Sequence, residues 1–261
     1  MKKSYPVIAL LVVAWLFSSC DNQSDQEPVP TNSVATATPT QVVPTPTTQL
    51  TPTDGPTVPL PEVSASSDTA SSSPTLLVAQ GLQVRGRAAD TDYSRDAFGT
   101  AWRDVDRNGC DTRNDILQRD FTTTIFKVGT GDCKVIGGTW TDPYSNESYT
   151  FDEAPIGAQI DHVVSLKNAW QMGADQWSED MRVEFANDPL NLRVTIASLN
   201  QQKSDSNATS WLPPFKPGRC DFVATQVAVK AKWNLYVTES EKGVFLAILS
   251  EPECLETKLP N

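Results

Sequence analysis

The chain has a single histidine, His162, and an acidic residue, Asp161, stands directly before it in the run QIDHVVSL. Imidazole titrates near neutral pH, so His162 is the candidate general base. Asn191 in NDPLNLRV and Asn200 in SLNQQKSD follow downstream. A carboxylate and an amide oxygen are hard ligands that favour Mg²⁺ or Mn²⁺ over Zn²⁺, so Asp161 and Asn200 are the candidate metal ligands. Activation of water beside such a cation is the chemistry of phosphodiester hydrolysis.

The segments that carry these residues are short. Their hydrophobic patterns, turn residues and helix caps predict a strand, two helices, a strand and a helix, at residues 159–164, 167–173, 178–185, 190–195 and 197–203. Adjacent residues on a strand point to opposite faces. Asp161 and His162 can therefore share one site only if the first strand ends or twists there, or if the metal lies at the edge of the strand.

The flanking segments predict a mixed α+β domain. The aromatic residues of segment 84–103 recur at near-helical spacing, which predicts a helix that packs them into the core and leaves Arg95 able to reach a phosphate. β-branched residues and glycines from 122 to 149 indicate hairpins. After a proline-rich run, two amphipathic helices are expected at 222–233 and 238–249, with Thr238 and Glu241 as a capping box.

A second acidic motif, DVDRNGCDTRND, runs from Asp104 to Asp115. Asp104, Asp106 and Asn108 match the first three ligand positions of a calcium loop, and a glycine follows at the sixth. The match weakens at the twelfth position, where Asp115 replaces a bidentate Glu. Three interpretations stay open: a structural Ca²⁺ site, a hydrogen-bonded acidic turn, and a role beside the active site in which Arg113 binds substrate.

The N-terminal part differs in composition from the rest. Residues 1–20 combine two lysines, an apolar stretch and the ending LFSSC, which resembles a bacterial lipobox with Cys20 as the lipidated residue. An ordinary cleaved signal and an uncleaved anchor are the alternatives, and each takes the remainder out of the cytoplasm. Residues 21–75 are rich in Pro, Thr and Ser, which predicts a disordered tether. Residues 76–261 are expected to form one globular domain, membrane-anchored or secreted.

Four cysteines remain once Cys20 is set aside: Cys110, Cys133, Cys220 and Cys254. An even number in an exported chain predicts two disulfides. Three pairings are open, and we favour the one between sequence neighbours, Cys110–Cys133 and Cys220–Cys254. Oxidised cysteines also exclude a thiol nucleophile and a zinc–thiolate site.

The formal net charge of −11 bears on the choice of partner. Affinity for nucleic acid comes largely from Lys and Arg that release counterions, so an acidic chain does not make a nonspecific nucleic-acid coat. If the domain handles DNA or RNA, it does so through a local site, where a metal ion would supply positive charge.

Seven blocks occur in order along the globular part: YSRDAF, NGCDTRND, GGTWTDPY, IDHVVSL, FANDPLNL, NQQKSD and WLPP. With these blocks, the chain from about Val84 to Cys254 resembles the secreted bacterial HNH-family endonucleases of the GmrSD-type domain class. IDHVV, NLRV and the asparagine that follows are similar to the ββα-metal site of HNH endonucleases. The resemblance implies a ββα-metal core embedded in a larger mixed domain with C-terminal helices. Ser165 departs from the family pattern, because the family commonly has proline at this position. The difference concerns the rigidity of the loop more than the chemistry.

The resemblance also implies a role for each residue of the motif. Asp161 and Asn200 would bind the metal, and His162 would be the general base. Asn191 would brace the loop that orients His162, and Lys203 would meet a phosphate. We expect an exported, monomeric endonuclease that uses Mg²⁺ or Mn²⁺ on DNA, with RNA as the second choice. The alternative is a non-catalytic surface module that binds a polymer or a partner and holds structural calcium.

Overall fold

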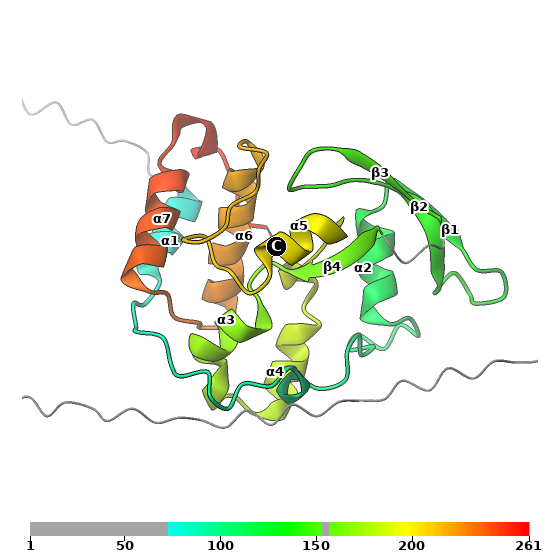
Figure 1. The fold of residues 1–261 in the computed structure, drawn as a ribbon, viewed down its shortest axis with the longest axis horizontal. Helices are drawn as coiled ribbons and strands as arrows, with labels where there is room; N and C mark the ends of the chain where they lie inside the picture. The colour runs from blue at the N-terminus through cyan, green and yellow to red at the C-terminus, as the bar shows by residue number, and fades with distance from the viewer. Residues whose placement is uncertain (1–72, 153–156, 261) are drawn as a thin grey trace, which may run out of the picture. The chain divides into compact units, whose positions relative to one another are not determined.

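The computed structural model describes residues 73–152 and 157–260. These residues form seven α-helices and two small antiparallel sheets, so the predicted α+β class is confirmed (Figure 1). The signal segment with Cys20 and nearly all of the expected tether lie outside the described residues. No helix in the described ranges is long and apolar enough to cross a bilayer.

A two-stranded sheet and the helix that follows it position most of the residues of interest. β4 (Ala158–His162) runs antiparallel to β5 (Leu192–Ile196). α5 (Ala197–Lys203) begins at the residue after β5 and packs against both strands. β-branched and apolar residues favour the two strands, and the straight side chains of the last segment favour a helix. The predicted order of strand, excursion, strand and helix is confirmed.

A three-stranded sheet lies to one side of this unit. Its strands, in the order in which they pair, are β1 (Thr123–Phe126), β2 (Val135–Thr141) and β3 (Ser148–Asp152). Both pairs are antiparallel, as the predicted hairpins require. α2 (Thr112–Asp120) lies between this sheet and β4 (Figure 1). Apolar side chains from α2 and both sheets form one buried cluster, which includes Ile116, Leu117, Trp140, Ile160 and Val194.

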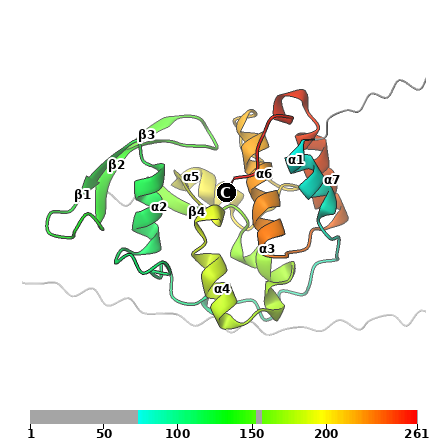
Figure 2. The same ribbon diagram turned by 180° about the vertical axis from the view of Figure 1, so that it is seen from behind.

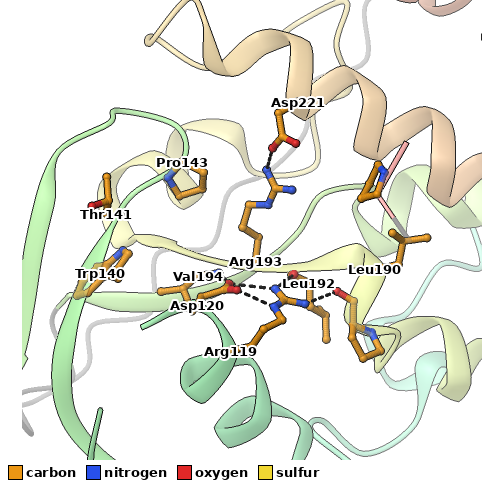
Figure 3. Close-up of a pocket in the computed structure, with 12 residues that line it drawn as sticks. Arg119, Asp120, Trp140, Thr141, Pro143, Leu190, Leu192, Arg193, Val194 and Asp221 are labelled. Carbon is orange, nitrogen blue, oxygen red and sulfur yellow. Dashed lines mark hydrogen bonds and ion pairs between the residues drawn. The ribbon is translucent and has the colours of Figure 1, made fainter. Parts of the chain in front are cut away.

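Side chains, instead of another strand, cover the free edge of β5. Asp120 Oδ2 accepts a hydrogen bond from the Val194 amide at 2.8 Å, and Arg119 Nη2 donates to the Leu192 carbonyl oxygen at 2.6 Å (Figure 3). A hollow of about 460 Å³ lies over this edge. Its two arginines, Arg119 and Arg193, are both paired with carboxylates. β5 is therefore protected from pairing with another chain.

α1, α3, α6 and α7 lie on the side of β4 that faces away from α2, and α4 lies beneath β4 in both views (Figures 1 and 2). α3 and α4 connect β4 to β5, and α1, α6 and α7 form one bundle with a shared apolar core. The bounds of these helices are Pro74–Gly81 for α1, Leu166–Gln171 for α3, Glu179–Ala186 for α4, Gly218–Lys232 for α6 and Glu239–Leu249 for α7. Short 3₁₀ helices lie at Arg95–Phe98, Ala174–Gln176, Pro189–Asn191 and Pro252–Cys254.

Two predicted helix caps are present. The Ser178 hydroxyl accepts a hydrogen bond from the Met181 amide, and the Thr238 hydroxyl accepts one from the Glu241 amide at 3.1 Å. The Glu241 side chain does not complete the predicted capping box, because it forms a fully buried ion pair with Lys230 at 3.1 Å. The prediction was therefore right about the helix start and wrong about the role of Glu241.

The predicted helix over residues 84–103 is wrong. This segment is irregular apart from the 3₁₀ helix Arg95–Phe98. Gly99 ends that turn with a φ of 76°, and a Cβ there would lie 2.5 Å from Val183 Cγ2, so glycine is required. Phe98 is nevertheless buried. The aromatic residues of this segment thus reach the core one at a time, without a helix to space them.

Both disulfides have the predicted pairing, Cys110–Cys133 and Cys220–Cys254. The first joins the segment before α2 to the loop before β2. The second joins the first turn of α6 to the 3₁₀ helix after α7. Two disulfides fit an extracellular location, because such bonds persist in oxidising surroundings.

Candidate active site

His162 is the last residue of β4, and only 8% of its surface is exposed. Its Nε2 atom lies 2.9 Å from the carbonyl oxygen of Ala186, at the end of α4. A carbonyl oxygen can only accept a hydrogen bond, so Nε2 carries the proton and Nδ1 carries the lone pair. The indole of Trp102 stacks on the imidazole, with ring centroids 6.1 Å apart and an angle of 16° between the planes. These contacts orient the ring and make Nδ1 its basic nitrogen.

Burial also decides the charge of this imidazole. It lowers the pKa of His162 to about 4, because an imidazolium would lose its hydration there. The hydrogen bond to Ala186 opposes this effect without reversing it. The side chain is therefore neutral near pH 7, which is the form that can accept a proton from water.

Asn191 holds the backbone that follows His162. Its side-chain oxygen accepts a hydrogen bond from the Val164 amide at 2.8 Å, and its side-chain nitrogen donates to the Val164 carbonyl oxygen at 3.1 Å. Its own carbonyl oxygen accepts from the Val163 amide at 2.8 Å. Asn191 is completely buried, so water does not compete for these bonds. One residue, directly before β5, thus fixes the chain where it leaves β4.

Asp161, beside His162 on β4, makes a different set of contacts. Its Oδ2 accepts a hydrogen bond from the Tyr144 hydroxyl at 2.7 Å, and its Oδ1 lies 2.9 Å from Lys203 Nζ. Lys203 also donates to the His162 carbonyl oxygen at 2.8 Å, and no part of its side chain is exposed. The predicted contact between Lys203 and a substrate phosphate is therefore wrong, because Asp161 and the β4 backbone enclose the ammonium group.

The two partners of Asp161 offset part of the cost of its burial. Burial raises the pKa of Asp161, because the carboxylate loses its hydration, while Lys203 and the Tyr144 hydroxyl act in the opposite direction. Burial and the neighbouring Asp161 raise the pKa of Tyr144 well above its ordinary value. The phenol therefore stays protonated and donates its hydrogen to the carboxylate.

Asp142 fixes the turn that carries Tyr144. Its Oδ1 accepts hydrogen bonds from the amides of Tyr144 and Ser145, at 2.8 and 3.1 Å. Its Oδ2 accepts from the Thr195 hydroxyl and the Ile196 amide, at 2.7 and 2.6 Å. Asp142 is completely buried. It joins the turn between β2 and β3 to the end of β5, and so determines where the Tyr144 hydroxyl lies.

A hollow of about 320 Å³ opens beside these residues. Its lining includes Asp161 and His162 from β4, Asn200 from α5, and the exposed Arg95 from the first 3₁₀ helix. Asn200 Nδ2 donates to Gln159 Oε1 at 2.8 Å, which leaves the Asn200 amide oxygen as an acceptor. The structure thus gathers an imidazole, a carboxylate, an amide and a guanidinium group around one space.

The end of β4 explains how adjacent residues can share this hollow. Side chains next to each other on a strand leave it on opposite faces. β4 ends at His162, and the backbone turns away there toward α3. Asp161 and His162 can therefore reach the same space from the two sides of the strand end, which is one of the arrangements that a shared site requires.

Arg113 and the acidic loop lie elsewhere. Arg113 Nη2 donates to the carbonyl oxygen of Ala158, at the other end of β4, and Arg113 does not line the hollow. The side chains of Asp104, Asp106 and Asn108 accept hydrogen bonds from backbone amides of their own loop. This is the geometry of a hydrogen-bonded acidic turn.

The residues of the hollow fit a hard divalent cation. A carboxylate oxygen has two lone pairs, and Asp161 uses one on each oxygen for Lys203 and Tyr144, so one on each remains. Asn200 adds an amide oxygen to the same hollow. In the described ranges, no three His, Cys, Asp or Glu side chains cluster closely enough to hold a metal ion. Water and substrate oxygens would complete the coordination shell, as is usual for Mg²⁺.

Two residues of the site were not singled out from the sequence. Trp102 was expected only as part of a core helix, and no sequence pattern connects it to His162. Tyr144 lies in the block GGTWTDPY, and its place in that block is the one signal that could have found it. Both residues meet their partners through tertiary contacts.

Comparison with known proteins gives two matches. The family described as GmrSD restriction endonucleases, C-terminal domain, matches residues 111–248. An uncharacterized secreted protein of Arthroderma benhamiae is 35% identical over 195 residues, which cover 74% of this chain and 89% of that protein. No solved structure matches the chain. The matched family segment includes β4, β5 and α5 with all the residues of the hollow that these elements carry.

Proposed function

The chain belongs to the family of GmrSD restriction endonuclease C-terminal domains, and from that premise we propose that it is an HNH-type endonuclease that hydrolyses phosphodiester bonds with a divalent cation. One observation carries the proposal. A neutral, oriented imidazole, His162, lines a hollow together with the Asp161 carboxylate and the Asn200 amide. β4, β5 and α5 would be the ββα-metal core.

His162 would act as the general base. Its Nε2 proton stays with the Ala186 carbonyl oxygen, so Nδ1 is the atom that takes a proton from the attacking water. Trp102 and Asn191 contribute by positioning, one through the ring and the other through the backbone. A fixed base lowers the entropic cost of reaching the reactive geometry.

Asp161 and Asn200 would hold Mg²⁺, and Mn²⁺ could replace it. When bound, such a cation supplies positive charge that stabilises the phosphate and the leaving oxygen. The protein's own part is to keep the two oxygen ligands in place. Tyr144 and Lys203 hold the Asp161 carboxylate, and Gln159 holds the Asn200 amide.

Arg95 would contact a phosphate of the substrate, because it is exposed and lines the hollow with His162. The acidic chain offers little general attraction for a polyanion, so a local cation has to supply it. The family's description names restriction endonucleases, which cut DNA, and we therefore favour DNA over RNA. The acidic turn at Asp104, Asp106 and Asn108 remains a candidate structural Ca²⁺ site.

Export and anchoring form a separate part of the proposal. The Arthroderma relative is described as secreted, and two disulfides fit that location. We propose that Cys20 carries a lipid that keeps the domain at a membrane, with a fully secreted form as the alternative. A Cys20→Ser chain expressed in a bacterial host should lose labelled fatty acid and move to the soluble fraction. Unchanged labelling would remove Cys20 as the anchor.

The function is tested by nicking of supercoiled plasmid. The wild-type chain should nick the plasmid with Mg²⁺ or Mn²⁺ and stop when EDTA is added. His162→Ala should lose nicking, and because the ring is buried, stacked on Trp102 and hydrogen-bonded to Ala186, its circular dichroism spectrum and melting temperature are measured beside wild type to show that the loss is not one of folding. Arg95→Ala should lower the rate, whereas Arg107→Ala, an exposed arginine outside this hollow, serves as its control. Undiminished nicking by His162→Ala would end the assignment of the base.

The rival interpretation is a non-catalytic module with structural calcium in the acidic turn. It predicts that Ca²⁺ raises the melting temperature while no divalent cation produces cleavage. Cleavage activated by Mg²⁺ or Mn²⁺ favours the enzyme.

A further inference from the structure

Asp161 already has a cation beside it before any metal binds. Lys203 Nζ lies 2.9 Å from Asp161 Oδ1, with no exposed surface on the lysine side chain and 4% on the carboxylate side chain. The Tyr144 hydroxyl takes the other oxygen at 2.7 Å. The carboxylate is therefore neutralised and hydrogen-bonded within the protein itself.

Helix α5 places this lysine and the second proposed ligand together. Asn200 and Lys203 are three residues apart, which puts them on the same side of a helix. Asn200 lines the hollow, and Lys203 reaches past it to Asp161 and to the His162 carbonyl oxygen. One helix thus supplies both a metal ligand and a positive charge that repels the metal.

We propose that Lys203 is an internal counter-ion of Asp161, which holds the metal-free site together and weakens the binding of the divalent cation. The inference rests on the proposed function in taking Asp161 as a metal ligand. A buried carboxylate without a partner is strongly unfavourable, so the metal-free protein needs Lys203. A divalent cation that approaches the same carboxylate meets the ammonium charge at close range, where buried charges are poorly screened.

Removal of the lysine should therefore have two opposite effects. Lys203→Met keeps the length and apolar stem of the side chain and removes its charge. Without metal, the variant should melt at a lower temperature than wild type, because Asp161 loses its partner. It should bind Mn²⁺ at least about tenfold more tightly, because the ammonium group that competes with the metal for the carboxylate is gone.

Lys167→Met is the matched control. Lys167 lines the same hollow, but its ammonium pairs with Asp90 and Asp205, at 3.1 and 3.3 Å, and not with Asp161. The substitution removes the same charge from the same region. We expect it to change Mn²⁺ affinity by less than about threefold, because the half-buried ammonium of Lys167 reaches solvent and is screened by it, and it is already paired with two carboxylates.

The experiment uses the full chain and titrates Mn²⁺ without substrate. Mn²⁺ affinity is read by electron paramagnetic resonance of the free ion, and stability is read by thermal melting at each concentration. Tighter binding by Lys203→Met than by wild type and Lys167→Met supports the inference. Equal or weaker binding by Lys203→Met overturns it. If Lys203→Met folds only when Mn²⁺ is present, that result also supports it.

Two further variants keep the outcome interpretable. If Lys203→Met does not fold under any condition, Lys203→Gln replaces it, because the amide keeps a hydrogen-bond donor for Asp161 without the charge. The same tightening is then required, and its absence overturns the inference. Asp161→Asn separates the two proposals. If Asp161→Asn binds Mn²⁺ as tightly as wild type, Asp161 is not a ligand and the proposed metal site is refuted. If Asp161→Asn loses Mn²⁺ binding and the Lys203 variants bind no more tightly than wild type, only the role of Lys203 is refuted.

Discussion

Asn191→Ala should be among the most damaging single substitutions in the domain. It removes both side-chain hydrogen bonds to Val164, whose backbone amide and carbonyl oxygen are buried. Each buried polar group that loses its partner costs about 1–3 kcal/mol, so the two together should lower the free energy of unfolding by about 2–6 kcal/mol. This is a large part of the 5–15 kcal/mol that is typical of a folded domain.

Asn187→Ala is the matched control for this substitution. Asn187 is also a buried asparagine, with 1% of its surface exposed, but its side chain makes one hydrogen bond, to the Val183 carbonyl oxygen. That oxygen also accepts from the Asn187 backbone amide, so it keeps a partner in the variant. The loss should be limited to about 1 kcal/mol, the ordinary net value of one hydrogen bond.

Urea unfolding of both variants, with linear extrapolation to water, measures the difference. Asn191→Ala should lose clearly more stability than Asn187→Ala, and its plasmid nicking should fall at temperatures where it is still folded, because the backbone after His162 is no longer held. Equal loss of stability in the two variants would refute the reasoning. It would mean that the backbone of Val164 finds other partners.

Three more substitutions test the structure around the site. Asp142→Ala leaves four donors, two of them in buried and two in part-buried hydrogen bonds, without their acceptor. It should lower the free energy of unfolding by at least about 3 kcal/mol, visible as a lower melting temperature; a shift of only a degree or two would contradict this. Trp102→Ala should slow nicking because His162 loses its stacked neighbour, and Trp102→Phe should recover most of the rate; equal rates in the two variants would show that stacking is unimportant. Replacing both Cys220 and Cys254 by alanine should lower the free energy of unfolding by about 3–4 kcal/mol, because the disulfide closes a loop with a sequence separation of 34 and so restricts the unfolded chain. An unchanged urea midpoint would argue against that entropic contribution.

Local interactions explain why so many elements could be predicted. Ser178 and Thr238 start helices because their hydroxyls accept hydrogen bonds from amides three residues ahead, a contact that the sequence alone contains. Strands β4 and β5 follow from short β-branched and apolar runs. The segment 84–103 misled the prediction because aromatic spacing also arises in an irregular chain. Gly99 turns that chain where a helix would have continued.

The candidate site shows the same difference between what local sequence predicts and what tertiary contacts decide. The residue types and order of Asp161, His162, Asn191 and Asn200 are enough to predict an imidazole base, a carboxylate and two amides, and hence a candidate chemistry. They do not determine which of the charged residues nearby face the substrate. Lys203 was expected at a phosphate, and the structure buries it against Asp161.

The sequence by itself therefore predicted the class of the fold and the order of strand, excursion, strand and helix around the candidate site. It favoured the cysteine pairing that the structure has, and it supplied the candidate reactive side chains. Tertiary structure decided how those side chains are held. Tyr144 and Trp102 meet Asp161 and His162 only because separate segments pack together, and burial then sets the charge of each group. The physical reason is that caps and periodicity act over a few residues, whereas desolvation and ion pairing depend on everything that surrounds a side chain in space.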